Sequence, residues 1–185
     1  MTVTVLDLAR WDRPADSDDR ALLDLCVGPT IDVGCGPGRL AADLAARGHV
    51  VLGIDVLGHA VGAAVRRGVT ALRRDVFEAL PGEGRWGTAL LADGNVGIGG
   101  DPVALLRRLR ELLAHDGRVV AELAAPGTAL TTGWAAVRVG SETGDPVRWA
   151  VLGVDDVDQV ARQADLLVGD VVRLGERWCA VMEAA

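Results

Sequence analysis

Three glycines at the end of a short apolar run constrain this chain more than any other feature. Residues 30–40 read Thr-Ile-Asp-Val-Gly-Cys-Gly-Pro-Gly-Arg-Leu, and residues 51–55 form a second apolar run that ends in an aspartate. This order predicts a strand, a tight turn, a helix and a second strand, an arrangement that binds nucleosides in open α/β sheets. Glycine lets the backbone approach a ligand closely, and an acid at the end of the second strand can accept hydrogen bonds from ribose hydroxyls.

The spacing of the glycines separates two kinds of nucleoside-binding unit. Gly34, Gly36 and Gly38 alternate as G-x-G-x-G, whereas the dinucleotide fingerprint is G-x-G-x-x-G. With Asp32 two residues before the first glycine, the string D-V-G-C-G-P-G resembles the first motif of class I S-adenosylmethionine-dependent methyltransferases, as does the acid that ends the second strand. The resemblance rests on specific motifs over about residues 29–125 and on architecture alone elsewhere.

Alternating apolar runs and amphipathic stretches predict an α/β fold, Rossmann-like and doubly wound, with a mainly parallel sheet and one antiparallel strand near the C-terminus. The resemblance implies seven strands in the order 3-2-1-4-5-7-6. We expect a single domain over residues 1–185. Residues 126–152 break the strand–helix rhythm and predict a cap or hairpin insertion. We expect this insertion to contribute to selection of the acceptor or to a subunit contact, as in a homodimer; the alternative is a hairpin that extends the core. Residues 1–15 are expected to be irregular, because Pro14 would interrupt an early helix.

Ligands of open α/β sheets bind at the carboxyl ends of the strands. The cofactor-binding residues that we expect follow the first three predicted strands: Asp32, Gly34, Gly36, Gly38, Asp55, Val56, Asp75 and Val76. The resemblance implies that Asp75 meets the adenine amino group and that the backbone amide of Val76 meets a ring nitrogen. Val56 and Val76 can enclose the flat base or belong to the core, and Asp55 can bind ribose or cap a helix.

Asp93 and Asn95 follow the fourth predicted strand, beside the position that the resemblance implies for the reactive methyl group. They can contact the methionyl amino group of the cofactor or the incoming nucleophile, and Asp93 is therefore a candidate for both cofactor binding and catalysis. The alternative is that they shape the turn around Gly94. Glu122, near the end of the fifth strand, is either a catalytic carboxylate or a structural one.

The histidines and tryptophans are weaker candidates. His49 and His115 are expected at the wrong end of the sheet for catalysis, and His59 near the nucleoside. Three tryptophans fall in segments that could cover the site, where an indole suits apolar contact with a ligand or packing: Trp11, Trp134 and Trp149.

Composition excludes several kinds of function. The net charge is -7, from 26 acids and 19 bases, so we expect no nucleic-acid partner. All 19 bases are arginine and tyrosine is absent, which removes Schiff-base lysine chemistry and the proton transfer of short-chain dehydrogenases. Three irregularly spaced cysteines predict reduced thiols, a cytoplasmic location and no metal site. No stretch resembles a secretory signal or a membrane span, so a membrane partner is not expected.

These residues and the resemblance together predict an enzyme that transfers a methyl group from S-adenosyl-L-methionine to a small-molecule acceptor. A thiol or an unprotonated amine would need no obvious base. A hydroxyl would need Asp93 or Glu122 to act as a general base. One alternative is a non-catalytic S-adenosylmethionine-binding module with a regulatory or partner-binding role, because the short amino-terminal segment leaves little chain for a substrate lid. A nicotinamide-dependent oxidoreductase is a second alternative, which the glycine spacing disfavours.

Overall fold

The computed structural model describes residues 3–185. Its strands and helices are, in chain order, β1 (Val3–Asp7), α1 (Ser17–Leu23), β2 (Thr30–Val33), α2 (Arg39–Ala46), β3 (Val51–Asp55), α3 (Gly58–Arg66), β4 (Ala71–Arg73), β5 (Trp86–Leu91), α4 (Pro102–Leu112), β6 (Leu113–Leu123), β7 (Thr131–Val139), β8 (Glu142–Thr143), β9 (Val147–Val151), α5 (Val157–Gln163), β10 (Leu166–Leu174) and β11 (Arg177–Ala184). No helix in this part of the chain has the length and apolar character needed to cross a membrane.

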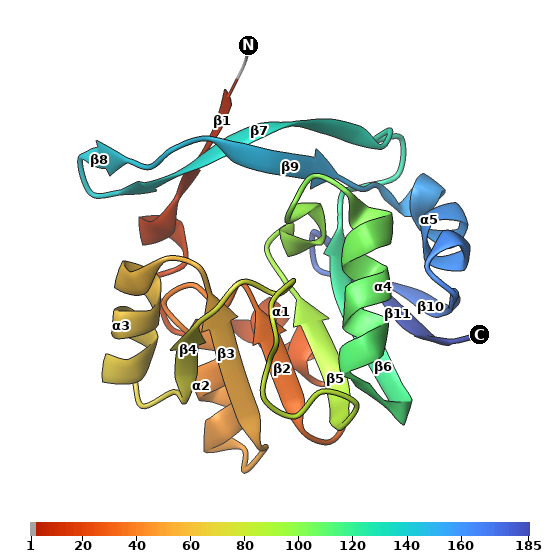
Figure 1. The fold of residues 1–185 in the computed structure, drawn as a ribbon, viewed down its shortest axis with the longest axis horizontal. Coiled ribbons are helices and arrows are strands. Elements are labelled where there is room, and N and C mark those ends of the chain that lie inside the picture. Colours follow the sequence, from red (N-terminus) through yellow and green to blue (C-terminus); the bar gives the residue numbers. More distant parts are fainter. Residues whose placement is uncertain (1–2) are drawn as a thin grey trace.

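Seven strands form the main sheet in the order β10-β11-β6-β5-β2-β3-β4. β11 is antiparallel to both of its neighbours, and the remaining pairs are parallel. Numbered along the chain and read from β4, this is the order 3-2-1-4-5-7-6, so the predicted topology and the single antiparallel strand near the C-terminus are confirmed. Leucines of α1 and α2 pack on one face and those of α4 on the other, which gives the doubly wound architecture in Figure 1.

Helix α1 begins with a reciprocal cap that also matters for the site. The Asp16 side chain accepts a hydrogen bond from the Asp19 amide at 2.9 Å, and the Asp19 side chain accepts one from the Asp16 amide at 3.1 Å. This capping box satisfies two backbone donors at the helix start. It also fixes the fully buried carboxylate of Asp19 at the end of α1 that faces α2.

A second, smaller sheet lies across the carboxyl ends of the parallel strands (Figure 1). β7 pairs with β9 in an antiparallel hairpin, and β1 pairs with β7 in parallel, Val3 beside Trp134. The prediction that residues 1–15 are irregular is therefore wrong for β1. Five residues carry too weak a local signal to specify a strand, and β1 forms because β7 offers it a partner far along the chain.

The second sheet rests tightly on the loop that follows β5. Ile98 forms an isolated antiparallel bridge with Trp149 of β9. A Cβ atom at Gly97 would lie 2.0 Å from the carbonyl oxygen of Ala150, and one at Gly100 would lie 2.9 Å from the Cβ atom of Arg148. Glycine at these two positions allows β9 to touch the loop backbone, so the second sheet is seated directly on the core.

Candidate functional site

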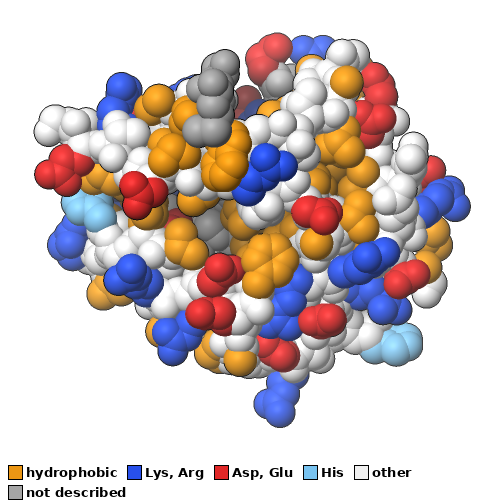
Figure 2. Space-filling model, turned by 45° about the horizontal axis from the view of Figure 1, so that its top comes forward, with side chains coloured by type: hydrophobic (Ala, Val, Ile, Leu, Met, Phe, Trp, Pro, Cys, Tyr) orange, Lys and Arg blue, Asp and Glu red, His pale blue; other side chains and the backbone are white. Residues whose placement is uncertain are grey.

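A cavity of about 340 Å³ lies between the two sheets. The main sheet supplies its floor from the turns that follow β2, β3, β4 and β5, and the second sheet supplies an apolar roof from Leu6, Val137, Val147 and Trp149. Hydrophobic side chains gather in the middle of the face that carries the second sheet, with arginines and acids around them (Figure 2). The cavity is thus at the end of the sheet where open α/β folds bind ligands, and it is covered.

The glycine turn after β2 forms one wall of the cavity. Gly36 has a positive φ of 54°, and a Cβ atom there would meet no atom of residues 3–185 within 4 Å. Gly34 also lines the cavity, and a Cβ atom there would lie 2.6 Å from Nδ2 of Asn95. Gly38 faces away from the cavity, because its Cβ position lies 2.8 Å from Cβ of Ala64 in α3. The turn therefore leaves open space at Gly36 and uses Gly38 for helix packing.

Asp55 ends β3 at the edge of the cavity. Its Oδ2 accepts a hydrogen bond from the Gly36 amide at 3.0 Å, and its Oδ1 accepts one from the Leu57 amide at 2.8 Å. Burial raises the pKa of the Asp55 carboxyl, while these amides oppose the rise by favouring the charged form. Each carboxylate oxygen can accept a further hydrogen bond, so Asp55 can hold the turn and still bind a ligand.

The next strand end supplies a polar and an apolar group. Asp75 lines the cavity, and its Oδ1 accepts a hydrogen bond from the Phe77 amide at 3.0 Å. Val76 is buried, whereas Val56 on the neighbouring loop is 54% exposed, and both line the cavity. Two valines and an acid therefore flank the part of the cavity that lies beyond Asp55.

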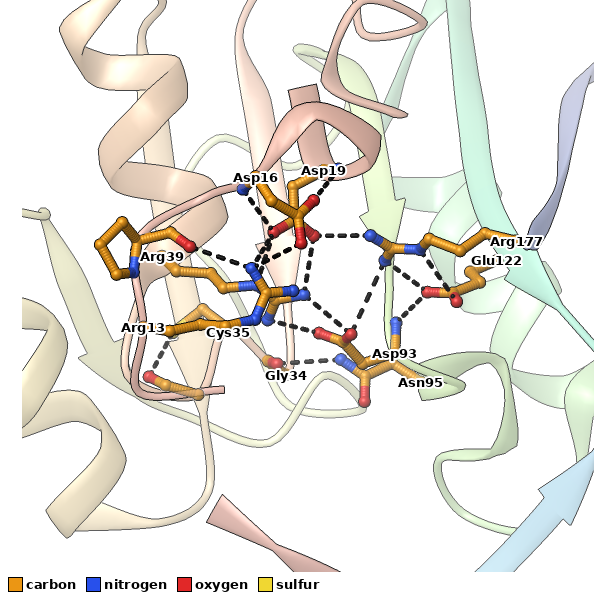
Figure 3. Close-up of polar contacts among 12 residues, drawn as sticks. Arg13, Asp16, Asp19, Gly34, Cys35, Arg39, Asp93, Asn95, Glu122 and Arg177 are labelled. Atoms are coloured by element: carbon orange, nitrogen blue, oxygen red, sulfur yellow. Dashed lines mark hydrogen bonds and ion pairs between the residues drawn. The ribbon is translucent and has the colours of Figure 1, made fainter. Parts of the chain in front are cut away.

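Beside the glycine turn, Arg39 holds two acids that come from distant parts of the chain (Figure 3). Its guanidinium donates to both oxygens of Asp93, at 2.7 and 2.8 Å, and to both oxygens of Asp19, at 3.2 and 3.0 Å. Arg39 is 5% exposed and Asp19 is fully buried. Burial opposes ionisation of Asp19, but the arginine hydrogen bonds prevail and hold its pKa well below the usual range.

Arg177 of β11 extends this network to β6. It donates to Oε1 and Oε2 of Glu122 at 3.1 and 2.7 Å and to Asp19 at 2.5 Å. Glu122 also accepts a hydrogen bond from the Asp93 amide at 2.6 Å, and Asp93 has a left-handed backbone with φ of 55°. Glu122 therefore fixes the backbone of Asp93, and it lines a smaller cavity of about 170 Å³ on the other side of Trp149.

Asp32, predicted to bind the cofactor, lies beneath the turn and does not line the cavity. It is 2% exposed, and its Oδ2 has no hydrogen-bond partner among residues 3–185. Burial, reinforced by the negative charge of Asp93, raises the pKa of Asp32 to about 7. In the folded protein this carboxyl is therefore far easier to protonate than in the unfolded chain.

Asp32 is expected to make stability fall as the pH rises. Below the ordinary pKa of 3.8 both states are protonated, whereas between about 4 and 7 the unfolded chain loses the proton that the folded one keeps. Asp32→Asn removes this dependence. Between pH 4 and pH 8 the free energy of unfolding of the wild type should therefore fall, relative to that of the variant, by on the order of 3 kcal/mol. Urea unfolding across this range measures it, with the exposed Asp116→Asn as control. Parallel curves for wild type and Asp32→Asn would contradict the assignment.

Solved structures that superpose on this chain assign its fold. A SAM-dependent methyltransferase from Bacteroides fragilis, in complex with S-adenosyl-L-homocysteine, matches with a TM-score of 0.77 at 22% identity, over 96% of this chain and 80% of its own. The CcbJ methyltransferase of Streptomyces caelestis matches with a TM-score of 0.72 at 18% identity, over 93% and 91%. The chain has the class I methyltransferase fold.

A third structure with the methyltransferase fold contains a small-molecule substrate. It is the 1,6-didemethyltoxoflavin-N1-methyltransferase of Burkholderia thailandensis, with 1,6-didemethyltoxoflavin and S-adenosylhomocysteine bound. It matches with a TM-score of 0.68 at 19% identity, over 96% of this chain and 81% of its own. By sequence alone, no family model and no curated protein matches this chain.

Within the methyltransferase fold, most of the predicted residues meet at one cavity and a few do not. Those that line it are Gly34, Gly36, Asp55, Val56, Asp75, Val76, Asp93 and Asn95. Asp32, Gly38 and Glu122 lie outside it, and so do the three histidines. Trp11 and Trp149 line the cavity, whereas the Trp134 ring lies outside it under the guanidinium of Arg148, 5.3 Å away.

Sequence reasoning did not identify Arg39 or the amino-terminal segment as parts of the site. Arg39 directly follows the third glycine, and a charged residue in so apolar a setting is a signal that it needs a buried partner. Leu6 and Leu8 bring the amino-terminal segment into the cavity wall. The apolar positions within Val3–Leu8 were the available signal for this role.

Proposed function

We propose that this protein is an S-adenosylmethionine-dependent methyltransferase that acts on a small molecule. The observation that carries the proposal is a single covered cavity that brings the glycine turn, Asp55 and the Asp75–Val76 pair together. Proteins with this fold include one solved with S-adenosyl-L-homocysteine and one solved with both 1,6-didemethyltoxoflavin and S-adenosylhomocysteine.

The residues present fit an adenosyl cofactor. Open space at Gly36 leaves room for a ligand against the turn, and Asp55 has acceptor capacity for the two ribose hydroxyls. Val56 and Val76 offer apolar contact for the base, with Asp75 beside them. S-adenosylmethionine bound here would supply a methyl group activated by its sulfonium.

The roof favours a small acceptor and a catalytic role. Its apolar side chains would shield one side of a bound acceptor from water, which favours transfer to the acceptor over hydrolysis. A silent binding module would be favoured if the chain had no segment to form a lid over the site. β1 and the β7–β9 hairpin together supply such a lid, and this supports the enzyme over the module.

Calorimetry with S-adenosylmethionine and with NAD tests the proposal. We expect S-adenosylmethionine to bind and NAD not to bind, because of the alternating glycines and Asp55. Asp55→Ala should weaken S-adenosylmethionine binding by about 1.5–3 kcal/mol, the range for loss of charge-assisted hydrogen bonds. Asp24→Ala, an exposed acid at the end of α1, is the matched control.

Two results would count against this assignment. Binding of NAD without binding of S-adenosylmethionine would refute the proposed cofactor. Normal affinity of Asp55→Ala for S-adenosylmethionine would mean that Asp55 only caps a helix. Formation of S-adenosylhomocysteine in the presence of an acceptor separates the enzyme from the silent module.

A further inference from the structure

Asn95 is held in one orientation by the glycine turn. Its Nδ2 donates hydrogen bonds to the carbonyl oxygens of Val33 and Gly34, both at 2.9 Å. The amide reaches these carbonyls only because residue 34 has no side chain, since a Cβ atom there would lie 2.6 Å from Nδ2. A flipped amide would place its oxygen against two carbonyl oxygens, so the two backbone acceptors determine which end of the amide is nitrogen.

The opposite end of this amide is an acceptor without a partner. Oδ1 of Asn95 receives no hydrogen bond from residues 3–185, and Asn95 lines the main cavity. Figure 3 shows Oδ1 on the side of the amide away from Gly34. A carbonyl oxygen held rigidly at a cavity wall is suited to accept a hydrogen bond from a ligand, because no reorganisation is needed when the ligand arrives.

We propose that Oδ1 of Asn95 accepts a hydrogen bond from an N–H group of the methyl acceptor, and that the acceptor is a small, largely apolar amine or nitrogen heterocycle. The inference rests on the proposed function and names its substrate class. Trp149 and Ile98, which bridge beside Asn95, and the apolar roof give a ring its contact surface. A thiol would be a weak donor to Oδ1, and an ether would be none.

The charged groups near Asn95 also favour nitrogen over a hydroxyl. A hydroxyl must lose its proton to become a good nucleophile, whereas an uncharged amine already has its lone pair. Asp93 receives two hydrogen bonds from Arg39, and Glu122 receives two from Arg177. Taking up a proton would break charge-assisted hydrogen bonds in either acid, and none of the three histidines lines the cavity.

The transfer is balanced without a protein base. The nitrogen lone pair forms a bond to the methyl carbon while the carbon–sulfur bond breaks, and its electron pair stays on sulfur. The methylated nitrogen is then positively charged and releases its proton to water. Asn95 holds the nitrogen by one N–H during attack, so it is a catalytic residue that orients the nucleophile rather than one that takes its proton.

Three bicyclic probes of nearly equal size test the hydrogen bond: indoline, which has a neutral N–H at pH 7, 2,3-dihydrobenzofuran, which has oxygen there, and N-methylindoline. Binding is measured by calorimetry on protein saturated with S-adenosylhomocysteine, whose own binding is established first. We expect indoline to bind about three- to tenfold tighter than the other two, the range for one net hydrogen bond. Asn95→Ala should bind the three probes with equal affinity. Val96→Ala, in the same turn, should keep the preference for indoline.

The outcomes separate this inference from the proposed function. Absence of S-adenosylhomocysteine binding would refute the proposed function itself. With that product bound, equal affinities for the three probes, no binding of indoline at millimolar concentration, or a preference that survives Asn95→Ala would each overturn the role of Oδ1. If Asn95→Ala does not fold, the ranking of the probes on the wild-type protein decides the question.

Discussion

Arg39→Met is expected to destabilise the protein by about 3–5 kcal/mol, the range for breaking a buried ion pair from one side. Methionine keeps most of the volume of the side chain and removes four hydrogen bonds, two to Asp19 and two to Asp93. Asp19 is fully buried and, among residues 3–185, would keep Arg13 and Arg177 as charged partners. The loss is large because a buried carboxylate cannot exchange its lost partner for water.

Arg47→Met is the matched control for this prediction. Arg47 follows the last residue of α2 and also pairs with two acids, Asp24 and Asp43, but its side chain is 28% exposed. Exposed pairs of this kind contribute about 0–1 kcal/mol. Urea unfolding of both variants at pH 7 measures the difference in the free energy of unfolding. An equal loss of stability in the two variants would contradict the prediction that the buried Arg39 network stabilises the protein more than an exposed one.

Gly36→Val is expected to weaken S-adenosylmethionine binding at least about a hundredfold, because the cavity space at residue 36 would be filled by a branched side chain. Gly36 has open space at its Cβ position and a backbone in the left-handed region. The substitution also strains the backbone, at a cost of about 1–2 kcal/mol in stability. Calorimetry and thermal unfolding measure the two effects separately.

Gly48→Val separates strain from obstruction. Gly48 has a φ of 86° and open space at its Cβ position, as Gly36 does, but it follows α2 outside the cavity. It should lose similar stability and keep its affinity for the cofactor. A Gly36→Val protein that binds S-adenosylmethionine normally would place the ligand elsewhere.

The fold was predictable where signals are local. β2 lies between Pro29 and Gly34, and β3 is an apolar run that ends at Asp55, so both strands have clear local boundaries. The resemblance implied the order in which the strands lie. β1 was not predictable in the same way, because its five residues form a strand only when β7 lies beside them. Long-range pairing leaves no mark on a short sequence window.

The site was predictable at strand ends and less so in its ion pairs. The topology alone brings Gly36, Asp55 and Asp75 to one edge of the sheet. Which acid each arginine binds depends on side-chain reach in three dimensions, so the pairing of Asp93 with Arg39 could not be inferred. The position of Trp134 could not be predicted either. Successive residues of a strand face opposite sides, so a shift of one position decides whether a side chain faces the cavity or the outside of the second sheet.

The parallel pairing of β1 with β7 has a consequence for how the chain matures. Asp7 and Arg138, joined by an ion pair at 2.6 Å, are 131 positions apart. Contacts at such separation are slow to form, because the entropy of closing a long loop must be lost first. During synthesis the amino-terminal segment has no partner until β7 emerges, so the glycine turn and its neighbouring strands can assemble while the cavity is still open to solvent. Enclosure of the cavity is therefore expected to be a late folding event, one that follows the formation of the parallel strands.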